Sequence, residues 1–361
     1  MTAANFKAHT LDHMLFLHRD EKQQVNCAII VYVDDFLIVR HESFPLEILT
    51  NMFKWGDWTE VRQGIRFKGK NIRMTKDQET KEWILTIDQE DFITGMTIGQ
   101  VPRSRSQSDP TLTAEELTEF RSCCGSLQWL AGQTRPDIAS AVSLSSKGLE
   151  TKIDDLKRLY RLMSYVKATS DVGITLKPIK LCSETIVVSY GDCSWANAEG
   201  MKSQEGIIVV LSSSDCLEGQ SRCIPMDWKT CRTPRVVRST LAGEAYAADD
   251  AIDRAHHVNA TLTEILTGDS ILNTGPILKH AHATDCRSLF DSVISSNPNT
   301  EEKRVLLTIR AIQEALDSKM MRWVPTDKMI ADILTKDSDN LRWSFLPWMR
   351  DPTCQLKRIA E

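Results

Sequence analysis

The sequence predicts a mixed protein of several domains, α+β or α/β in class, in which small antiparallel sheets, a helical middle and a C-terminal mixed sheet follow one another. Alternating polar and apolar residues in 58–74 and 83–87 predict antiparallel strands. Apolar runs at 185–190 and 277–284, each followed closely by an acid, predict strands of the C-terminal sheet. Helical periodicity with clear start signals lies between them. The 361 residues are enough for roughly two or three domains.

The composition is that of an ordinary globular protein, with 42% hydrophobic and 26% charged residues. No run approaches the roughly 18 uninterrupted apolar residues of a membrane helix, and residues 1–13 lack the apolar core of a signal peptide. Ten cysteines without a Cys-x-x-Cys pair favour core packing in a reducing compartment over zinc or redox roles. We therefore expect an intracellular protein, cytoplasmic or nuclear, with no membrane partner.

An apolar hairpin with an acidic pair at its turn is expected near the N-terminus. The run 25–39 is interrupted at its centre by Asp34 and Asp35, which predicts two strands joined by a turn. Adjacent carboxylates repel each other unless a cation or a basic group lies nearby, so this pair is a candidate metal site. The alternative is a simple aspartate-containing turn.

Three helices are expected after a polar linker at 99–113. Thr113 and Glu116 have the Thr-x-x-Glu spacing of a capping box, which begins the first helix. Pro136 breaks the helical pattern and restarts it, because proline is tolerated in the first turn of a helix. The third helix spans 153–168. None of these helices carries residues that indicate chemistry, so we expect them to pack and to bridge.

Four acids form the strongest functional signal of the chain, in the order strand, helix, strand, helix: Asp192, Glu244, Asp285 and Asp332. The first and third close predicted strands, and the second enters a helix opened by Ser239. Two divalent cations about 4 Å apart can activate a water and stabilise the leaving oxygen of a phosphodiester, and such hard cations prefer carboxylate oxygens. The chain has 49 acidic residues, so the prediction depends on the order of all four.

A basic segment is expected as a loop that leads into the Glu244 helix. Its cations include Lys229, Arg232, Arg235 and Arg238. Between 222 and 238 only Asp227 opposes them, so this loop could hold a nucleic-acid backbone. The formal net charge of -5 argues against a nucleic-acid enzyme, because phosphate binding usually leaves a basic footprint. A solvated loop with scattered cations is the alternative.

These motifs together resemble the Pol polyprotein of copia-type long-terminal-repeat retrotransposons. The resemblance covers about residues 12–340. It rests on four features: the acidic hairpin, the segment 125–127 followed by 134–139, a series of matching residues within 157–173, and the Asp332 segment. It implies a truncated reverse-transcriptase palm and thumb, a helical thumb and connection region, a ribonuclease H-like domain and a tail. The corresponding ranges are 1–100, 101–178, 179–340 and 341–361. The third part should hold a mixed five-stranded sheet with flanking helices, its first three strands antiparallel.

The resemblance also implies roles for the acids. Asp192 would bridge two Mg²⁺ or Mn²⁺ ions, Glu244 and Asp285 would hold one of them, and Asp332 would complete the other, so that RNA paired to DNA is cut. Asp34 and Asp35 match the paired palm carboxylates of the polymerase. The third palm carboxylate and the fingers have no counterpart, so polymerase activity is not expected.

The expected partners are an RNA/DNA hybrid, recognised by its shape and 2′-hydroxyls, and other parts of the same polyprotein. The basic side chains named above would hold backbone phosphates. Four positions depart from the family's pattern: Ala245, Cys286, Arg304 and Leu306. None is a ligand carboxylate, but they leave open a second function, a non-catalytic nucleic-acid clamp or an inactive relic.

Histidines close to the acids are further candidates. His280 and His282 alternate on the strand before Asp285, and a role in proton transfer is possible for one that faces the site. His256 and His257 follow Glu244 by about three turns, and we interpret them as the end of that helix.

Overall fold

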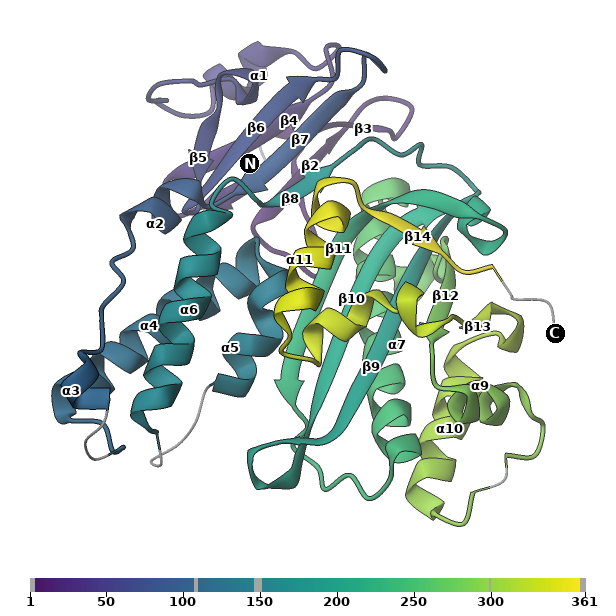
Figure 1. The fold of residues 1–361 in the computed structure, drawn as a ribbon. Coiled ribbons are helices and arrows are strands. Elements are labelled where there is room, and N and C mark those ends of the chain that lie inside the picture. The colour runs from purple at the N-terminus through teal and green to yellow at the C-terminus, as the bar shows by residue number, and fades with distance from the viewer. Residues whose placement is uncertain (1–3, 107–109, 146–150, 299, 358–361) are drawn as a thin grey trace.

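The N-terminal sheet contains the predicted hairpin. In the computed structural model, which describes residues 4–106, 110–145, 151–298 and 300–357, this is one of three sheets (Figure 1). Its antiparallel strands, in spatial order, are β1 (Lys7–Ala8), β2 (Leu15–Arg19), β3 (Val25–Tyr32) and β4 (Asp35–Arg40). Tyr32 pairs with Asp35, so the turn consists of Val33 and Asp34, and the hairpin prediction is confirmed. The short helix α1 (Leu46–Thr50) follows.

A second antiparallel sheet takes strands from both sides of the helical region. Its strands are β5 (Ile65–Phe67), β6 (Lys70–Lys76), β7 (Trp83–Asp88) and β8 (Ile174–Leu176). The expectation of strand from residue 58 was wrong, because the first strand begins at 65 and a 3₁₀ turn, η2 (Val61–Gln63), precedes it. The helix α2 (Glu90–Gly95) then leads away from this sheet.

The helical region begins and ends where its caps predict. Its elements are α3 (Arg103–Ser106), α4 (Ala114–Gln133), η3 (Pro136–Ile138), α5 (Ala139–Ser145) and α6 (Ile153–Ala168). The Glu116 amide donates to Thr113 Oγ1 at 3.3 Å and the Thr113 amide donates to Glu116 Oε2 at 2.9 Å, which confirms the capping box. The linker expected at 99–113 contains α3, and its residues 107–109 lie outside the described part. Buried leucines of α4 and α6 belong to one core that also includes residues of the large sheet.

The large C-terminal sheet has the predicted mixed topology. Its strands are β9 (Thr185–Ala198), β10 (Lys202–Ser213), β11 (Gln220–Arg232), β12 (Lys279–Thr284), β13 (Met321–Trp323) and β14 (Thr353–Gln355). The spatial order of the strands is β13-β12-β9-β10-β11-β14. The neighbours β9, β10 and β11 are antiparallel, whereas β12 runs parallel to β9 and β13 runs parallel to β12. Five strands were expected, and the sixth, β14, adds residues of the presumed tail to the edge of the sheet.

Two boundaries in this sheet differ from expectation. The first strand does not end near Asp192, because β9 continues to Ala198 and Asp192 pairs with Gly206 in its interior. The segment 222–232 is not a loop, because β11 extends to Arg232. Gly200 and Pro234 lie two residues beyond the true strand ends, so each end carries a local signal that the expected boundaries did not use.

Helices cover both faces of the large sheet (Figure 1). On one face lies α7 (Thr240–Thr267), whose N-cap Ser239 accepts a hydrogen bond from the Ala242 amide. Packed against α7 are α9 (Arg287–Ile294) and α10 (Lys303–Ala315), and the short α8 (Ile271–Thr274) follows α7 in sequence. The other face is covered by α5, the 3₁₀ helix η8 (Ile330–Leu334) and α11 (Asp339–Arg350), and α4 and α6 pack against α5. His256 and His257 lie inside α7, so their interpretation as a helix end was wrong.

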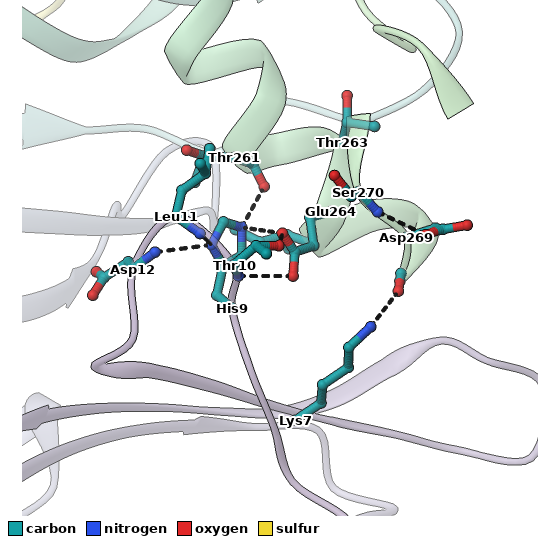
Figure 2. A network of polar contacts seen from close by, with 12 residues as sticks. Lys7, His9, Thr10, Leu11, Asp12, Thr261, Thr263, Glu264, Asp269 and Ser270 are labelled. Carbon is teal, nitrogen blue, oxygen red and sulfur yellow. Dashed lines mark hydrogen bonds and ion pairs between the residues drawn. The ribbon is translucent and has the colours of Figure 1, made fainter. Parts of the chain in front are cut away.

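The N-terminal sheet is attached to the C-terminal end of α7 by polar contacts (Figure 2). Arg19 donates to the carbonyl oxygens of Glu264 and Ile265 at 2.9 and 2.6 Å, and Lys7 donates to that of Gly268 at 3.2 Å. The Thr10 amide donates to Glu264 Oε1 at 2.9 Å. The last carbonyl groups of a helix have no hydrogen-bond donors within the helix. Here, side chains of the N-terminal strands supply donors to these carbonyl groups.

Among the described residues, no helix combines the length and hydropathy that a membrane span requires. The division of the chain into the four parts 1–100, 101–178, 179–340 and 341–361 stays a prediction.

Candidate metal centre

Three acids from three elements meet beside β9 and β12. Asp192 lies within β9, Glu244 lies in the second turn of α7, and Asp285 directly follows β12. One carboxylate oxygen of each lies within 4.8 Å of the others. Because β9 and β12 are parallel neighbours and α7 packs on β9, the fold joins residues that are distant in sequence.

The fourth acid, Asp332, approaches this group on η8, a 3₁₀ helix and not the α-helix expected. Gly206 makes the approach possible, because a Cβ atom at this position would lie 2.7 Å from the Thr335 methyl group. Gly206 is the partner of Asp192 across the strands, so the space it leaves lies beside that acid. The Thr335 methyl group lies in this space, and the Thr335 hydroxyl donates to Asp192 Oδ2.

The acids are crowded and mostly buried. Burial raises the pKa of Asp192 to about 7, and the charge of Asp332 acts in the same direction. Burial raises the pKa of Glu244 to about 9, with further contributions from Asp192 and Asp285. Without a cation, the centre therefore retains protons at a pH where free carboxyl groups have lost them.

The oxygen donors fit a hard divalent cation. Glu244 Oε2 and Asp332 Oδ1 are buried and have no hydrogen-bond partner among the residues that the structure describes. Such oxygens are costly unless a proton or a cation satisfies them. Asp285 is held in place, since Thr326 Oγ1 donates to its Oδ2 at 2.8 Å and Trp323 Nε1 donates to its carbonyl at 2.9 Å. Carboxylates are the ligands that Mg²⁺ and Mn²⁺ prefer.

Two residues of this centre were not assigned a role from the sequence. Thr335 is fully buried against Asp192, and the ammonium group of Lys336 lies 2.7 Å from Asp332 Oδ2. Both directly follow the segment that carries Asp332. The signal that could have found Lys336 is its spacing of four residues from that acid, which places side chains together on a helix.

The histidines on β12 do not reach the acids. His280 Nε2 and His282 Nδ1 each lie 2.8 Å from the Ser189 hydroxyl. Asp192 lies three positions after Ser189 on the same strand, so the two side chains lie on opposite faces of the sheet. Burial lowers the pKa of His282 to about 3. Both rings belong to the interior under α7, where His256 contacts His280, and the geometry does not support proton transfer to the centre.

The basic residues divide into two kinds. Lys229 lies on β11 and forms ion pairs with Glu205 at 3.1 Å and Asp250 at 2.9 Å, which hold its ammonium group against the protein. Arg232, at the end of the strand, donates to the Ser143 carbonyl at 3.3 Å. Arg235 and Arg238 are exposed in the loop between β11 and α7, with Arg235 over the Tyr246 ring at 5.2 Å.

The acidic pair of the N-terminal hairpin belongs to a different sheet. Asp34 and Asp35 are both exposed, and Lys68 lies 5.1 Å from the ring centre of the neighbouring Tyr32.

Of the four positions that depart from the family's pattern, Ala245 is buried and Arg304 is exposed, and Cys286 and Leu306 are half-buried.

Comparison with known proteins gives the family. No protein-family model matches the chain. The chain is 25% identical over 324 residues to the retrovirus-related Pol polyprotein from transposon RE2 of Arabidopsis thaliana, over 85% of this chain and 20% of that protein. It is 30% identical over 232 residues to the uncharacterized mitochondrial protein AtMg00810 of the same plant, over 60% of this chain and 88% of that protein.

The chain belongs to the family of retrovirus-related Pol polyproteins of copia-type transposons. It spans about a fifth of the length of the Pol polyprotein that it matches.

Solved structures with a detectable likeness include ribonuclease H1 of the archaeon Halobacterium salinarum, 15% identical, covering 41% of this chain and 92% of that one with a TM-score of 0.28. Another is a foamy viral protease-reverse transcriptase in complex with an RNA/DNA hybrid. It is 12% identical, and the match covers 73% of this chain and 37% of that one with a TM-score of 0.29. Scores this low carry no weight for the fold, which rests on the sheet order described above.

Proposed function

We propose that the region 179–340 is a ribonuclease H-type nuclease, which hydrolyses the RNA strand of RNA/DNA hybrids with two Mg²⁺ or Mn²⁺ ions. The observation that carries the proposal is the meeting of Asp192, Glu244 and Asp285 within 4.8 Å. Their position on a mixed sheet of this topology, together with buried carboxylate oxygens that lack partners, also supports it.

Each residue of the centre has a task in this proposal. Asp192 would contribute to both cation positions, Glu244 and Asp285 would help to hold one ion, and Asp332 would help to hold the other. Bound there, the two ions supply an activated water and stabilise the leaving oxygen of the phosphodiester. The Thr335 hydroxyl orients Asp192.

The substrate surface is expected at the loop that precedes α7. Arg235 and Arg238 are exposed there and are positioned to hold backbone phosphates, which carry no sequence information. We assign Arg232 a weaker share of this role and Lys229 mainly a structural one, because two carboxylates hold the lysine. The regions 1–100 and 101–178 are proposed as a polymerase remnant, and other parts of the polyprotein as partners.

The test is cleavage of a hybrid that carries a label on its RNA strand, with magnesium, by the purified chain and by Asp192→Asn. We expect metal-dependent cutting that falls at least about a hundredfold in the variant, since one ligand of both ions is weakened. Asp253→Asn, an exposed position on α7, is the matched control and should cut normally. Hybrid binding without any cutting would overturn the proposal and indicate the non-catalytic clamp.

A further inference from the structure

The ammonium group of Lys336 is already bound to one of the proposed metal ligands. Its Nζ lies 2.7 Å from Asp332 Oδ2. Asp332 is 7% exposed, and its second oxygen, Oδ1, has no hydrogen-bond partner among the described residues. The Lys336 side chain is 41% exposed, so its charged end lies between the buried acid and solvent.

We propose that Lys336 is a built-in counter-ion that competes with one of the two divalent cations for Asp332. In the absence of substrate, the position formed by Asp192, Glu244 and Asp285 binds its cation first. The position that needs Asp332 is completed only when the ammonium group of Lys336 moves away. This inference rests on the proposed function, because it concerns how the same centre is loaded.

The local structure allows the side chain of Lys336 to move while its backbone stays in place. The Lys336 amide donates to the Asp332 carbonyl at 3.1 Å, and the Lys336 carbonyl accepts a hydrogen bond from Ser140 Oγ at 3.0 Å. The four-carbon stem of a lysine is flexible, and its ammonium group is a compact charge that makes no fixed fork of hydrogen bonds. Movement of the side chain alone therefore exposes Asp332.

The position of Asp332 relative to the other acids agrees with stepwise loading. Asp192, Glu244 and Asp285 form the group within 4.8 Å, whereas Asp332 lies outside it, paired with the lysine. A phosphate of a bound nucleic acid would offer the released ammonium group a new anionic partner. Binding of substrate would then favour binding of the second cation.

The experiment is a calorimetric titration of the full chain with Mn²⁺, without nucleic acid. Lys336→Met removes the charge and keeps much of the side-chain length. We expect the second Mn²⁺ to bind about tenfold more tightly in this variant, because the cation no longer displaces a hydrogen bond to a charged group. Lys336→Arg keeps the charge and should bind Mn²⁺ as the wild type does.

Lys328→Met is the matched control, since Lys328 lies in the preceding turn and pairs with the exposed Asp327. Its titration should equal that of the wild type. Lys336→Gln provides a second neutral variant, and circular dichroism checks that each variant is folded. Titrations of Lys336→Met and Lys336→Gln that equal the wild type would overturn the inference.

Asp192→Asn distinguishes the two levels of the proposal. If this variant loses Mn²⁺ binding while the Lys336 variants bind as the wild type does, only the counter-ion role fails. If Asp192→Asn binds Mn²⁺ as tightly as the wild type, the metal centre itself fails, and the counter-ion role fails with it.

Discussion

Arg135 and Asp137 form a fully buried ion pair at the break between α4 and α5. Two parallel hydrogen bonds of 2.9 and 2.8 Å join them, and Arg135 also donates to the carbonyl and hydroxyl oxygens of Thr169. The Tyr165 hydroxyl donates to Asp137 at 2.9 Å. The two motifs of the family resemblance at 134–139 and 157–173 therefore meet in one network, so their residues join the helices and serve no chemistry that the structure shows.

Substitution of Arg135 by methionine should destabilise the protein strongly. The change leaves the carboxylate of Asp137 buried without its cation. Removing one partner of a buried ion pair lowers the free energy of unfolding by about 3–5 kcal/mol. Urea unfolding followed by tryptophan fluorescence measures the loss. Arg121→Met, at an exposed position of α4, is the control and should change the free energy of unfolding by less than about 0.5 kcal/mol. Equal stability of the two variants would contradict this account.

The raised pKa values of Asp192 and Glu244 predict how stability depends on pH without metal. A carboxyl group whose pKa is higher in the folded state holds a proton there that the unfolded chain has lost. The contribution is fully present below the unfolded pKa and is lost as pH rises toward about 7 for Asp192 and about 9 for Glu244. Stability in chelator should therefore fall between about pH 5 and pH 9, by on the order of 1 kcal/mol per pH unit.

Unfolding in urea with a chelator at pH 6, 7 and 8 measures this slope. Glu244→Gln removes the group with the highest pKa of the pair and should flatten the fall. Magnesium should stabilise the wild type more at pH 8 than at pH 6, because a cation binds the ionised carboxylates of the folded state. A slope that is unchanged in Glu244→Gln would show that another group causes it.

At the scale of elements, local signals predicted helices better than strand ends. The caps at Thr113 and Ser239 and the helix at 153–168 needed only neighbouring residues, because a cap acts within one turn. The strands β8 and β14 have three residues each, too few to show a period of two. Their partners β7 and β11 lie far away in sequence, so only the folded chain reveals them.

The same limit applies to the attachment of the N-terminal sheet to α7. The residues around Lys7 and Arg19 show no pattern that predicts contact with a distant helix. Arg19 and Glu264, which are in contact, are 245 positions apart in the sequence. In the candidate centre, Asp285 follows the end of β12 and Glu244 follows the cap at Ser239, which are local signals, whereas Asp192 lies inside β9 and was found through the order of the four acids. Gly206 and Thr335, which set the distance between η8 and β9, were not predicted.

Replacement of Arg19 by alanine should loosen the N-terminal sheet. The change leaves the carbonyl groups of Glu264 and Ile265 without this donor, which costs about 1–3 kcal/mol for each buried group that water does not reach. Hydrogen exchange followed by mass spectrometry should show faster exchange in β1, β2 and the last turn of α7. Arg40→Ala, at the exposed end of β4, is the control. Unchanged exchange in β2 would mean that apolar contacts alone hold this sheet.

At the scale of the whole molecule, the acids are divided between separate sheets. Asp34 and Asp35 lie in the exposed turn of the N-terminal hairpin, whereas the four acids of the candidate centre belong to the large sheet and to the helices that cover it. The two parts are connected through the end of α7 that is remote from Glu244. Glu264 lies twenty residues beyond Glu244, which is about 30 Å along a helix.

This separation predicts that the hairpin acids do not contribute to hybrid cleavage. Asp34→Ala changes an exposed charge that, at such a distance, is largely screened at physiological ionic strength. We expect its rate of hybrid cleavage to stay within about twofold of the wild type, since a surface substitution of this kind leaves the centre and its ligands in place. Asp285→Asn, measured beside it, should lose most activity.

Primer extension on an RNA template tests the other half of the same prediction. Polymerisation requires carboxylates from two palm strands to hold the two metals that align the nucleotide, and the hairpin, as the proposed polymerase remnant, would supply one such strand. The chain alone should therefore incorporate no nucleotides. Templated incorporation that disappears in Asp34→Ala would refute this, and it would mean that the hairpin pair is completed by an acid from a second copy or from elsewhere in the chain. A fall in hybrid cleavage in the same variant would instead show that the two parts are coupled through α7.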